Sequence, residues 1–439
     1  MKTTSLLFSL ALALSLLAMQ AHSDEQAFDF DKARKIFERH QRGQSITAEE
    51  EAYAKRAKAE RKRQQEAGDP APATAAKPGT GAAVAGEIDR QKARAIFQRR
   101  QNGEKLSAED EAYLQRAMAA RRGGGGEGAA AAPPKWTGHL TPLTELGTAK
   151  YQGEDGGLYG GGNNEPPKTH LDAALKESAK IRPLDAEGNP SADGRIGLLS
   201  VGMSNTTMEY SRFKQLADAD PAKSAKVIVL DGAQGGQTAT RWADLKSPLW
   251  QKVDERMKAA GLSAKQVQVA WMKQAEAGPA KHGEFPKHAK QLQDNLVKGL
   301  ANLKEKFPNL RIVYLSSRIY AGYATTQLNS EPYAYEEAFT MRWLIQDQIA
   351  GKRELNYDST RGVVKSPLLL WGPYLWADGE TPRKTDGLTY TREDLSSGDG
   401  THPADSGRTK VANLLLNFLK TDPTAKSWFT GESPKTNSR

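Results

Sequence analysis

The sequence predicts a three-layer α/β/α domain built on a five-stranded parallel sheet, and two observations carry that prediction. Short apolar runs recur through the C-terminal part of the chain, and segments with helical periodicity separate them. Because the runs are apolar throughout, the strands are expected to be covered by helices on both faces. Strands that alternate with helices form parallel sheets. The predicted strands span residues 196–201, 227–230, 267–272, 310–315 and 368–371.

The clearest of the predicted helices spans residues 288–307. Leu292, Leu296, Leu300 and Leu303 recur at intervals that place them on one face of this helix. In a parallel α/β sheet, functional groups collect on the loops past the carboxyl ends of the strands. A candidate site is therefore expected at that edge.

The first residues have the pattern of a secretory signal peptide. Lys2 gives a positive start, residues 6–18 form a short apolar segment, and Ala21 and Ser23 are small residues where a signal peptidase reads the chain. The apolar segment is too short to span a bilayer, which disfavours a membrane anchor. We expect cleavage near Ser23 and a secreted or periplasmic protein without a transmembrane span.

A repeated segment follows the signal peptide. Residues 31–57 are similar to residues 90–117, and each copy is typical of a helical hairpin. Gly43 is expected to end the first helix, and Thr47 with Glu50 forms a capping box that begins the second. Such small modules bury little apolar surface. A tether or spacer is one interpretation, and docking to an envelope or protein partner is the other.

Composition shifts divide the chain into six predicted segments. Two runs rich in Ala, Gly and Pro separate the repeats from each other and from the α/β domain. The segments are a signal peptide at 1–23, a helical repeat at 24–66, a linker at 67–86, a second repeat at 87–121, a linker at 122–135 and the α/β domain at 136–439.

Charge and cysteine content narrow the chemistry. Lys and Arg together exceed Asp and Glu by 62 − 53 = 9, which favours anionic partners in general. No nucleic-acid-binding motif accompanies this charge, so nucleic acid is not an expected partner. The chain has no cysteine, which excludes disulfides and thiol catalysis.

Three residues combine into a candidate for nucleophilic catalysis. Ser204 follows the first predicted strand in "LLSVGMSNTT", where a helix N-cap is the ordinary alternative. Asp399 and His402 lie three residues apart before the last predicted helix. A carboxylate at this spacing can bond the Nδ1 atom of the histidine and leave Nε2 to take a proton from a serine. A cation site of Asp399, His402 and Asp405 is a weaker alternative.

The order of these blocks resembles the SGNH, or GDSL-like, hydrolase superfamily. The resemblance covers residues 194–419, and the Asp-x-x-His-Pro block followed by Gly407 is its most specific part. It implies a flavodoxin-like sandwich and esterase or lipase activity, commonly on acetyl groups of sugars, with Ser204 as the nucleophile, His402 as the base and Asp399 as its orienting acid. The "GMSN" turn is similar to that of the sugar O-acetylesterases.

The resemblance also implies an oxyanion hole. Its donors would be the backbone N–H groups of Ser204 and Gly236 and the side-chain amide of Gln274, which stands where the family usually has Asn. A glutamine amide offers the same N–H one methylene further out. The competing α/β-hydrolase elbow requires Gly-x-Ser-x-Gly, but Thr206 occupies the last position.

Four further residues are candidates for binding a substrate. Asn205 follows the nucleophile candidate, and Arg318 follows the fourth strand, where it could meet an acidic group or be an ordinary surface charge. Tyr320 and Trp371 lie in aromatic loop clusters on which a sugar ring could stack, although core packing explains such aromatics equally well.

The sequence thus predicts an exported serine ester hydrolase acting on O-acylated carbohydrate or another small ester. No metal and no organic cofactor are expected. The alternative is a catalytically inactive protein on the same fold that binds carbohydrate or an envelope partner, which the change from Asn to Gln274 motivates. A pure interaction protein, in which the repeats carry the function, is a third hypothesis.

Overall fold

The computed structural model describes residues 106–123 and 136–431, and before them only residues 47, 49–50, 52–53, 89, 92–93, 95–96 and 99. The chain divides into two units, Met1–Gly86 and Glu87–Arg439. The predicted signal peptide, the linker at 67–86 and most of the first repeat lie outside the described residues. So does the linker at 122–135 beyond residue 123.

The described parts of the two repeats show local contacts of the kind that hairpins make. The Thr47 hydroxyl accepts from the Glu50 backbone N–H at 3.2 Å, and the Glu50 carboxylate accepts from the Thr47 N–H at 3.1 Å. This is a capping box. In the second copy, helix α5 (Ala108–Gly123) is joined to the preceding segment by an ion pair of 2.9 Å between Arg99 and Asp110.

The α/β domain is built on a five-stranded sheet in which every neighbouring pair is parallel. The strand order is β4-β3-β5-β6-β7, so the chain moves outward from β3 to β4 and then returns past β3 to β5. This is the flavodoxin-like order, and its switch point lies between β3 and β5. The predicted fold class is confirmed. The strands are β3 (Ile196–Gly202), β4 (Val227–Leu230), β5 (Val267–Lys273), β6 (Ile312–Leu315) and β7 (Leu368–Trp371).

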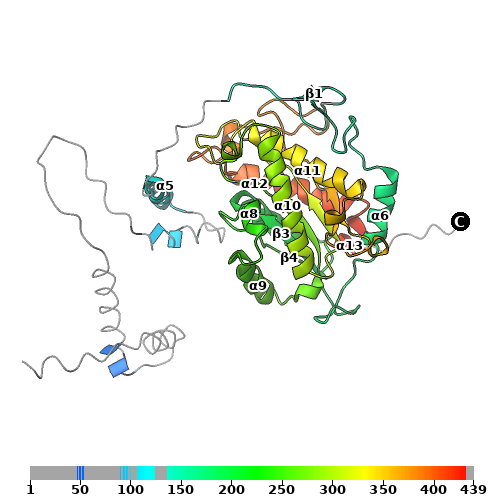
Figure 1. The fold of residues 1–439 in the computed structure, drawn as a ribbon. Coiled ribbons are helices and arrows are strands. Elements are labelled where there is room, and N and C mark those ends of the chain that lie inside the picture. The colour runs from blue at the N-terminus through cyan, green and yellow to red at the C-terminus, as the bar shows by residue number, and fades with distance from the viewer. Residues whose placement is uncertain are drawn as a thin grey trace, which may run out of the picture. The chain divides into compact units, whose positions relative to one another are not determined.

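Helices form the two outer layers (Figure 1). Helix α7 (Ser204–Ala219) packs beside α12 (Asp405–Thr421), and α10 (Lys287–Lys306) packs beside both α8 (Ala239–Trp242) and α11 (Tyr333–Ile349). The predicted helix at 288–307 is thus α10, within one residue at each end. The remaining α-helices of the domain are α6 (Lys168–Ser178), α9 (Leu249–Ala259) and α13 (Lys426–Thr430), and a short hairpin of β1 (Lys150–Tyr151) and β2 (Glu154–Asp155) precedes them.

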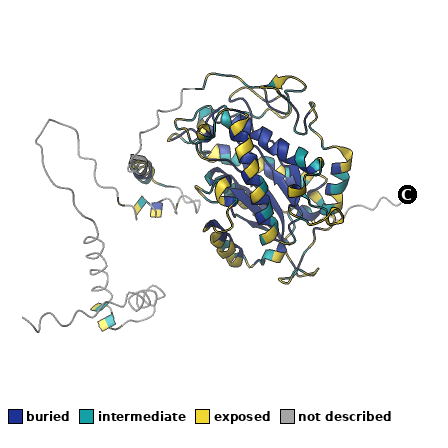
Figure 2. Cartoon of the chain, viewed as in Figure 1, coloured by how far each residue is buried: buried dark blue, intermediate teal, exposed yellow. Residues whose placement is uncertain are grey.

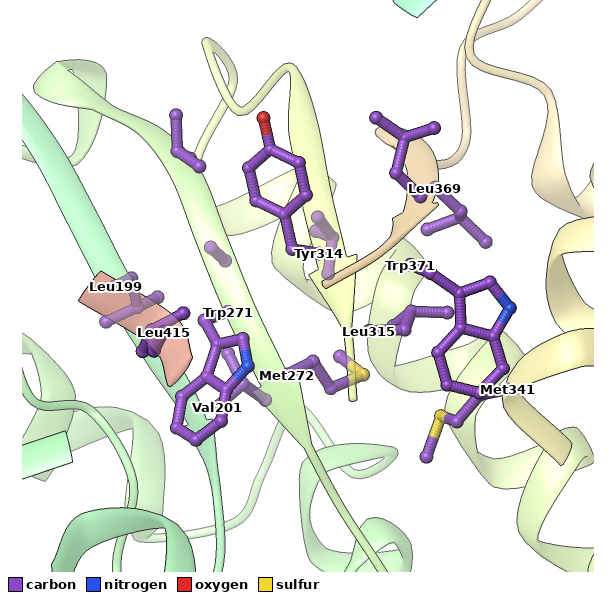
Figure 3. Packing of buried hydrophobic residues seen from close by; sticks show 14 of the residues in the cluster. Leu199, Val201, Trp271, Met272, Tyr314, Leu315, Met341, Leu369, Trp371 and Leu415 are labelled. Atoms are coloured by element: carbon purple, nitrogen blue, oxygen red, sulfur yellow. The ribbon is translucent and has the colours of Figure 1, made fainter. Parts of the chain in front are cut away.

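The core lies on both faces of the sheet, where the strands are buried, whereas exposed residues lie on the outer surfaces of the helices and in the loops (Figure 2). Successive side chains of a strand point to opposite faces. Trp271 accordingly stacks on Tyr210 of α7, with ring centroids 5.8 Å apart, while Met272 lies on the other side near Leu315 (Figure 3). Within the described residues, no helix is both long enough and apolar enough to cross a membrane.

Candidate functional site

Ser204 stands at the switch point of the sheet, directly beyond the carboxyl end of β3. The helix α7 begins at Ser204, its N-cap is Met203, and no side chain caps this end. Ser204 is therefore not the N-cap that its sequence context allowed. Gly202, the last residue of β3, permits a close approach here, because an added Cβ atom would lie 2.2 Å from the Thr206 hydroxyl oxygen and 2.4 Å from the Lys273 carbonyl oxygen.

Ser204, His402 and Asp399 form one continuous hydrogen-bonded chain. The Ser204 Oγ and His402 Nε2 atoms are 2.7 Å apart, and the His402 Nδ1 and Asp399 Oδ2 atoms are 2.5 Å apart. Both ring nitrogens of His402 are thereby engaged. The residues come from opposite ends of the domain sequence, and the adjacency of α7 and α12 brings them together.

The carboxylate of Asp399 is held in its ionised form. Burial on its own would raise the pKa of Asp399, but His402 and the backbone N–H groups of Thr401 and His402 hold that pKa well below its usual range. Both backbone N–H groups donate to Oδ1 at 3.0 Å, which leaves Oδ2 for the His402 ring. An ionised carboxylate at this position fixes the histidine tautomer and stabilises an imidazolium.

Asn205 ties the serine turn to the loop that carries the histidine. Its side chain is 1% exposed, and its amide donates to the Thr401 carbonyl oxygen at 3.0 Å. One N–H of this buried amide is thus bonded to the protein. We include Asn205 in the proposed site as a residue that holds Ser204 against His402, rather than as one that touches the substrate.

A glycine turn after β4 passes beside Ser204. A Cβ atom added to Gly235 would lie 3.9 Å from the Ser204 Cβ atom. Gly236 has a φ of +76° and open space where a side chain would be. A glycine adopts this backbone conformation without strain. The turn therefore runs next to the serine with a backbone that no side chain shields.

The half-buried carboxylate of Asp231 anchors this glycine turn. It accepts from the Ser200 hydroxyl at 2.5 Å, from the Ala233 N–H at 3.2 Å and from the Thr207 hydroxyl. Burial raises the pKa of Asp231 above its usual value, while these donors oppose the rise. The contacts join the end of β4 to β3 and to the first turn of α7.

Gln274 lies against the same turn. It is 1% exposed, and its Nε2 atom donates to the Gln237 carbonyl oxygen at 3.2 Å while its Oε1 atom accepts from the Ala275 N–H at 3.0 Å. An amide nitrogen carries two N–H donors. One of them is used by the turn, and the second is the donor that the oxyanion hypothesis requires.

Lys273, the last residue of β5, is joined to α7 by hydrogen bonds to Glu209 and Thr206. Its ammonium, buried at 0% exposure, contacts both Glu209 carboxylate oxygens at 2.5 Å, and its carbonyl oxygen accepts from the Thr206 hydroxyl at 2.6 Å. Burial lowers the pKa of Lys273 to about 8, although Glu209 counteracts this effect. The pairing occupies the ammonium, so Gln274 rather than Lys273 is the side-chain donor to consider.

Arg318 is a buried residue, which excludes the interpretation that it is a solvated surface charge. It is 3% exposed, and its Nε and Nη1 atoms have no hydrogen-bond partner among the described residues. Its charge acts on Lys273 and on Glu337, whose pKa burial raises to about 8. Arg318 thus belongs to a buried charged group beneath the strand ends.

The two aromatic candidates occupy different places. Trp371 is 5% exposed in β7, its indole N–H donates to the Leu158 carbonyl oxygen at 2.7 Å, and it packs in the hydrophobic core (Figure 3). Core packing accounts for this residue, and we leave it out of the proposed substrate site. Tyr320 lines a surface cavity together with Tyr323.

Sequence reasoning did not single out Glu209 or Asp231. Glu209 sits on the face of α7 that also carries Phe213 and Ala217, both fully buried. A charged residue on an apolar helix face, opposite a lysine that ends an apolar strand, was the available signal. Asp231 lay within a block quoted for its glycines, and its role depends on contacts with Ser200 and Thr207 that only the fold creates.

Comparison with known proteins gives distant similarities. No family model and no curated protein matches the chain. Protein YXIM of Bacillus subtilis is 14% identical over 53% of this chain and 57% of its own, with a TM-score of 0.28. A gut microbial diltiazem-metabolizing enzyme is 16% identical over 51% and 46% of the two chains, with a TM-score of 0.29. A candidate acylhydrolase from Bacteroides fragilis is 13% identical over 58% and 97%, with a TM-score of 0.29. These similarities are too low to indicate a shared activity.

Proposed function

We propose that the protein is an exported serine ester hydrolase that removes acyl groups, acetyl in particular, from carbohydrate. The observation that carries this proposal is the chain of hydrogen bonds from Ser204 through His402 to Asp399. A serine hydroxyl at hydrogen-bond distance from an imidazole, itself oriented by a buried carboxylate, is the arrangement that activates a hydroxyl as a nucleophile.

The reaction follows from these contacts. Ser204 Oγ attacks the ester carbonyl carbon as its proton moves to His402 Nε2, and a tetrahedral oxyanion forms. His402 then gives the proton to the departing alkoxide, which leaves as the hydroxyl group of the sugar. The acyl group remains bonded to Ser204 as an acyl-serine. Water, deprotonated by His402, attacks the acyl-serine and releases the carboxylic acid with Ser204 restored.

The oxyanion needs donors that are in place before the reaction. In the proposal these are the Ser204 N–H at the first turn of α7, the Gly236 N–H of the exposed glycine turn and the second N–H of Gln274. The support is that all three residues belong to one set of joined loops: Gly235 lies beside Ser204, and Gln274 bonds the backbone of Gln237.

Hydrolysis of p-nitrophenyl acetate and of glucose pentaacetate tests the proposal. We expect the wild-type chain to hydrolyse both, and Ser204→Ala to be folded but slower by several orders of magnitude. Absence of hydrolysis by the wild type, together with retained binding of oligosaccharide, would instead favour an inactive carbohydrate-binding protein. That alternative is motivated by Gln274, whose amide already donates one N–H to the protein.

A further inference from the structure

A surface cavity of about 380 Å³ lies beside the loop that carries His402. Its lining residues come from three separate segments: His139 from the start of the domain, Tyr320 and Tyr323 from the loop after β6, and Asp378 to Thr381 from the loop after β7. The function proposed above leaves this cavity without a role.

The wall of the cavity is in direct contact with the Asp399–His402 loop. A Cβ atom added to Gly400 would lie 1.8 Å from the Tyr323 carbonyl oxygen, and the Thr325 N–H donates to the Asp399 carbonyl oxygen at 2.9 Å. Gly400, with a φ of +62°, permits this close approach. A ligand in the cavity would therefore sit one loop away from the histidine.

The aromatic part of the lining is held by contacts between its rings. The rings of Tyr320 and Tyr323 meet edge to face with centroids 5.3 Å apart, and Tyr320 meets Trp376 in the same way at 6.1 Å. Buried Glu331 holds Trp376 and the loop that carries the two tyrosines, since it accepts from the Trp376 indole N–H and from the Ala321 N–H, both at 2.8 Å. Rings held in this way lose little freedom when they contact a ligand.

The polar part of the lining is acidic. Asp378, 8% exposed, pairs through Oδ2 with His139 Nδ1 at 2.9 Å, and Glu380 accepts from the Tyr323 hydroxyl at 3.3 Å. The lining has two carboxylates, and His139 is its one residue that can carry a positive charge. Carboxylates accept hydrogen bonds from hydroxyl groups and repel other anions.

We propose that this cavity is a subsite for a sugar ring without a negative charge, a neutral or amino sugar, in the carbohydrate from which the acyl group is removed. Tyr323 supplies an apolar face for the ring, the buried Tyr320 supports Tyr323 edge to face, and Asp378 and Glu380 accept from the hydroxyl or ammonium groups of the sugar. A uronate ring is disfavoured here, even though the whole chain is basic. The role of the subsite in deacylation rests on the proposed function, whereas the binding of the sugar ring does not.

Binding is measured with the Ser204→Ala chain, so that no turnover interferes. Calorimetric titration with chitosan tetramer, chitotetraose and tetragalacturonate should give binding of the first two and at least tenfold weaker binding of the third. Tyr323→Ala in the same background should weaken binding of chitotetraose about tenfold. Equal or tighter binding of tetragalacturonate, or no effect of Tyr323→Ala, would overturn the proposal.

A kinetic experiment separates this inference from the proposed function. In the otherwise wild-type chain, Tyr323→Ala should raise the KM for acetylated chitosan tetramer about tenfold and leave the turnover of p-nitrophenyl acetate unchanged. Lys287→Ala, in a separate surface cavity lined by Lys281 and His282, is the matched control and should change neither. An unchanged KM in Tyr323→Ala would overturn the subsite. If the wild type does not hydrolyse p-nitrophenyl acetate, the proposed function alone is overturned.

Discussion

Two of the three histidine–carboxylate pairs among the described residues have similar geometry and different surroundings. His402 and Asp399 are joined at 2.5 Å, with side chains 18% and 4% exposed. His288 and Glu336 are joined at 2.7 Å, with side chains 1% and 2% exposed. The His402 imidazole is partly exposed and faces the Ser204 hydroxyl, whereas the second pair is buried between α10, which carries His288, and α11, which carries Glu336.

The sealed pair is part of the scaffold. Glu336 also accepts from the Tyr151 hydroxyl at 2.6 Å and from the Gln152 amide at 3.2 Å, and the His288 ring meets Tyr333 edge to face. These contacts tie the short hairpin at the start of the domain to its helical layer. A carboxylate beside a histidine thus indicates chemistry only where the other ring nitrogen meets a nucleophile at an accessible edge.

The largest expected effect separates the two histidines. His402→Ala should lower kcat for p-nitrophenyl acetate by about four to six orders of magnitude, because the nucleophile loses its base. It should cost less free energy of unfolding than His288→Ala, because the buried Asp399 carboxylate keeps the backbone N–H donors of Thr401 and of residue 402. Stopped assays with high enzyme concentration and urea unfolding measure the two quantities.

His288→Ala is expected to do the reverse. Removing one partner of a buried pair leaves an uncompensated carboxylate, which costs about 3–5 kcal/mol of stability. Molecules that remain folded should keep the wild-type kcat. A variant at residue 288 that stays stable and loses activity would contradict the scaffold role of this pair.

The next effect tests the carboxylate of the accessible pair. Asp399→Asn replaces an acceptor with an amide that cannot hold the productive tautomer of His402, so kcat should fall by about 10⁴. Asp405→Asn, at the exposed start of α12, is the matched control and should leave kcat unchanged. Comparable activity of the two variants would remove Asp399 from the mechanism.

Gln274 should have a smaller effect than the triad. Gln274→Ala removes one donor to the oxyanion, which typically costs about a hundred- to a thousandfold in kcat with little change in KM. Gln274→Glu should be at least as harmful, because a carboxylate repels the oxyanion. Gln237→Ala keeps the carbonyl that accepts from Gln274 and serves as the control. Near-normal kcat in both Gln274 variants would leave the oxyanion to backbone donors.

The last effect is on stability rather than on kcat, and it concerns Glu337, the neighbour of Glu336. Its Oε1 atom accepts from the Asn329 amide at 2.8 Å, but its Oε2 atom is buried without a partner among the described residues. Burial raises the pKa of Glu337 from 4.5 to about 8. The folded state therefore favours the protonated form, and the stability that this form contributes is present below pH 4.5 and is lost as the pH rises through 8.

Glu337→Gln removes this titration. The stability of the wild type relative to the variant should decline between pH 5 and pH 8, as measured by urea unfolding at fixed ionic strength. Glu331, whose pKa burial raises to about 7, titrates in both chains, and its charge also raises the pKa of Glu337, so the comparison removes the separate titration of Glu331 but not this coupling. Parallel stability curves would show that Glu337 does not titrate in this range.

The strands were predictable because burial on both faces leaves a continuous apolar run. Four of the five predicted strands begin at the observed residue, and the exception, at 310–315, begins later because Leu310 closes a turn onto Phe307 before β6 starts. The strand order was not predicted from the residues, since it depends on contacts between segments that no local pattern encodes.

The three residues of the hydrogen-bonded chain were predictable because their chemistry and spacing are rare in combination. Their catalytic roles remain predictions. Trp371 could not be separated from Tyr320 in the sequence, because an aromatic residue near the end of a strand has the same sequence context whether it packs in the core or lines a cavity. The commitment of Asn205 to the Thr401 carbonyl oxygen likewise depends on two loops that meet only in the fold.

Covalent labelling of Ser204 tests the central claim most directly. A fluorophosphonate forms a stable bond with a serine that a neighbouring base activates, and peptide mass spectrometry locates the adduct. We predict a single adduct on Ser204 in the wild-type chain, and its absence in the folded His402→Ala chain. An unlabelled Ser204 in the wild type, or equal labelling of Ser204 in both chains, would contradict the account.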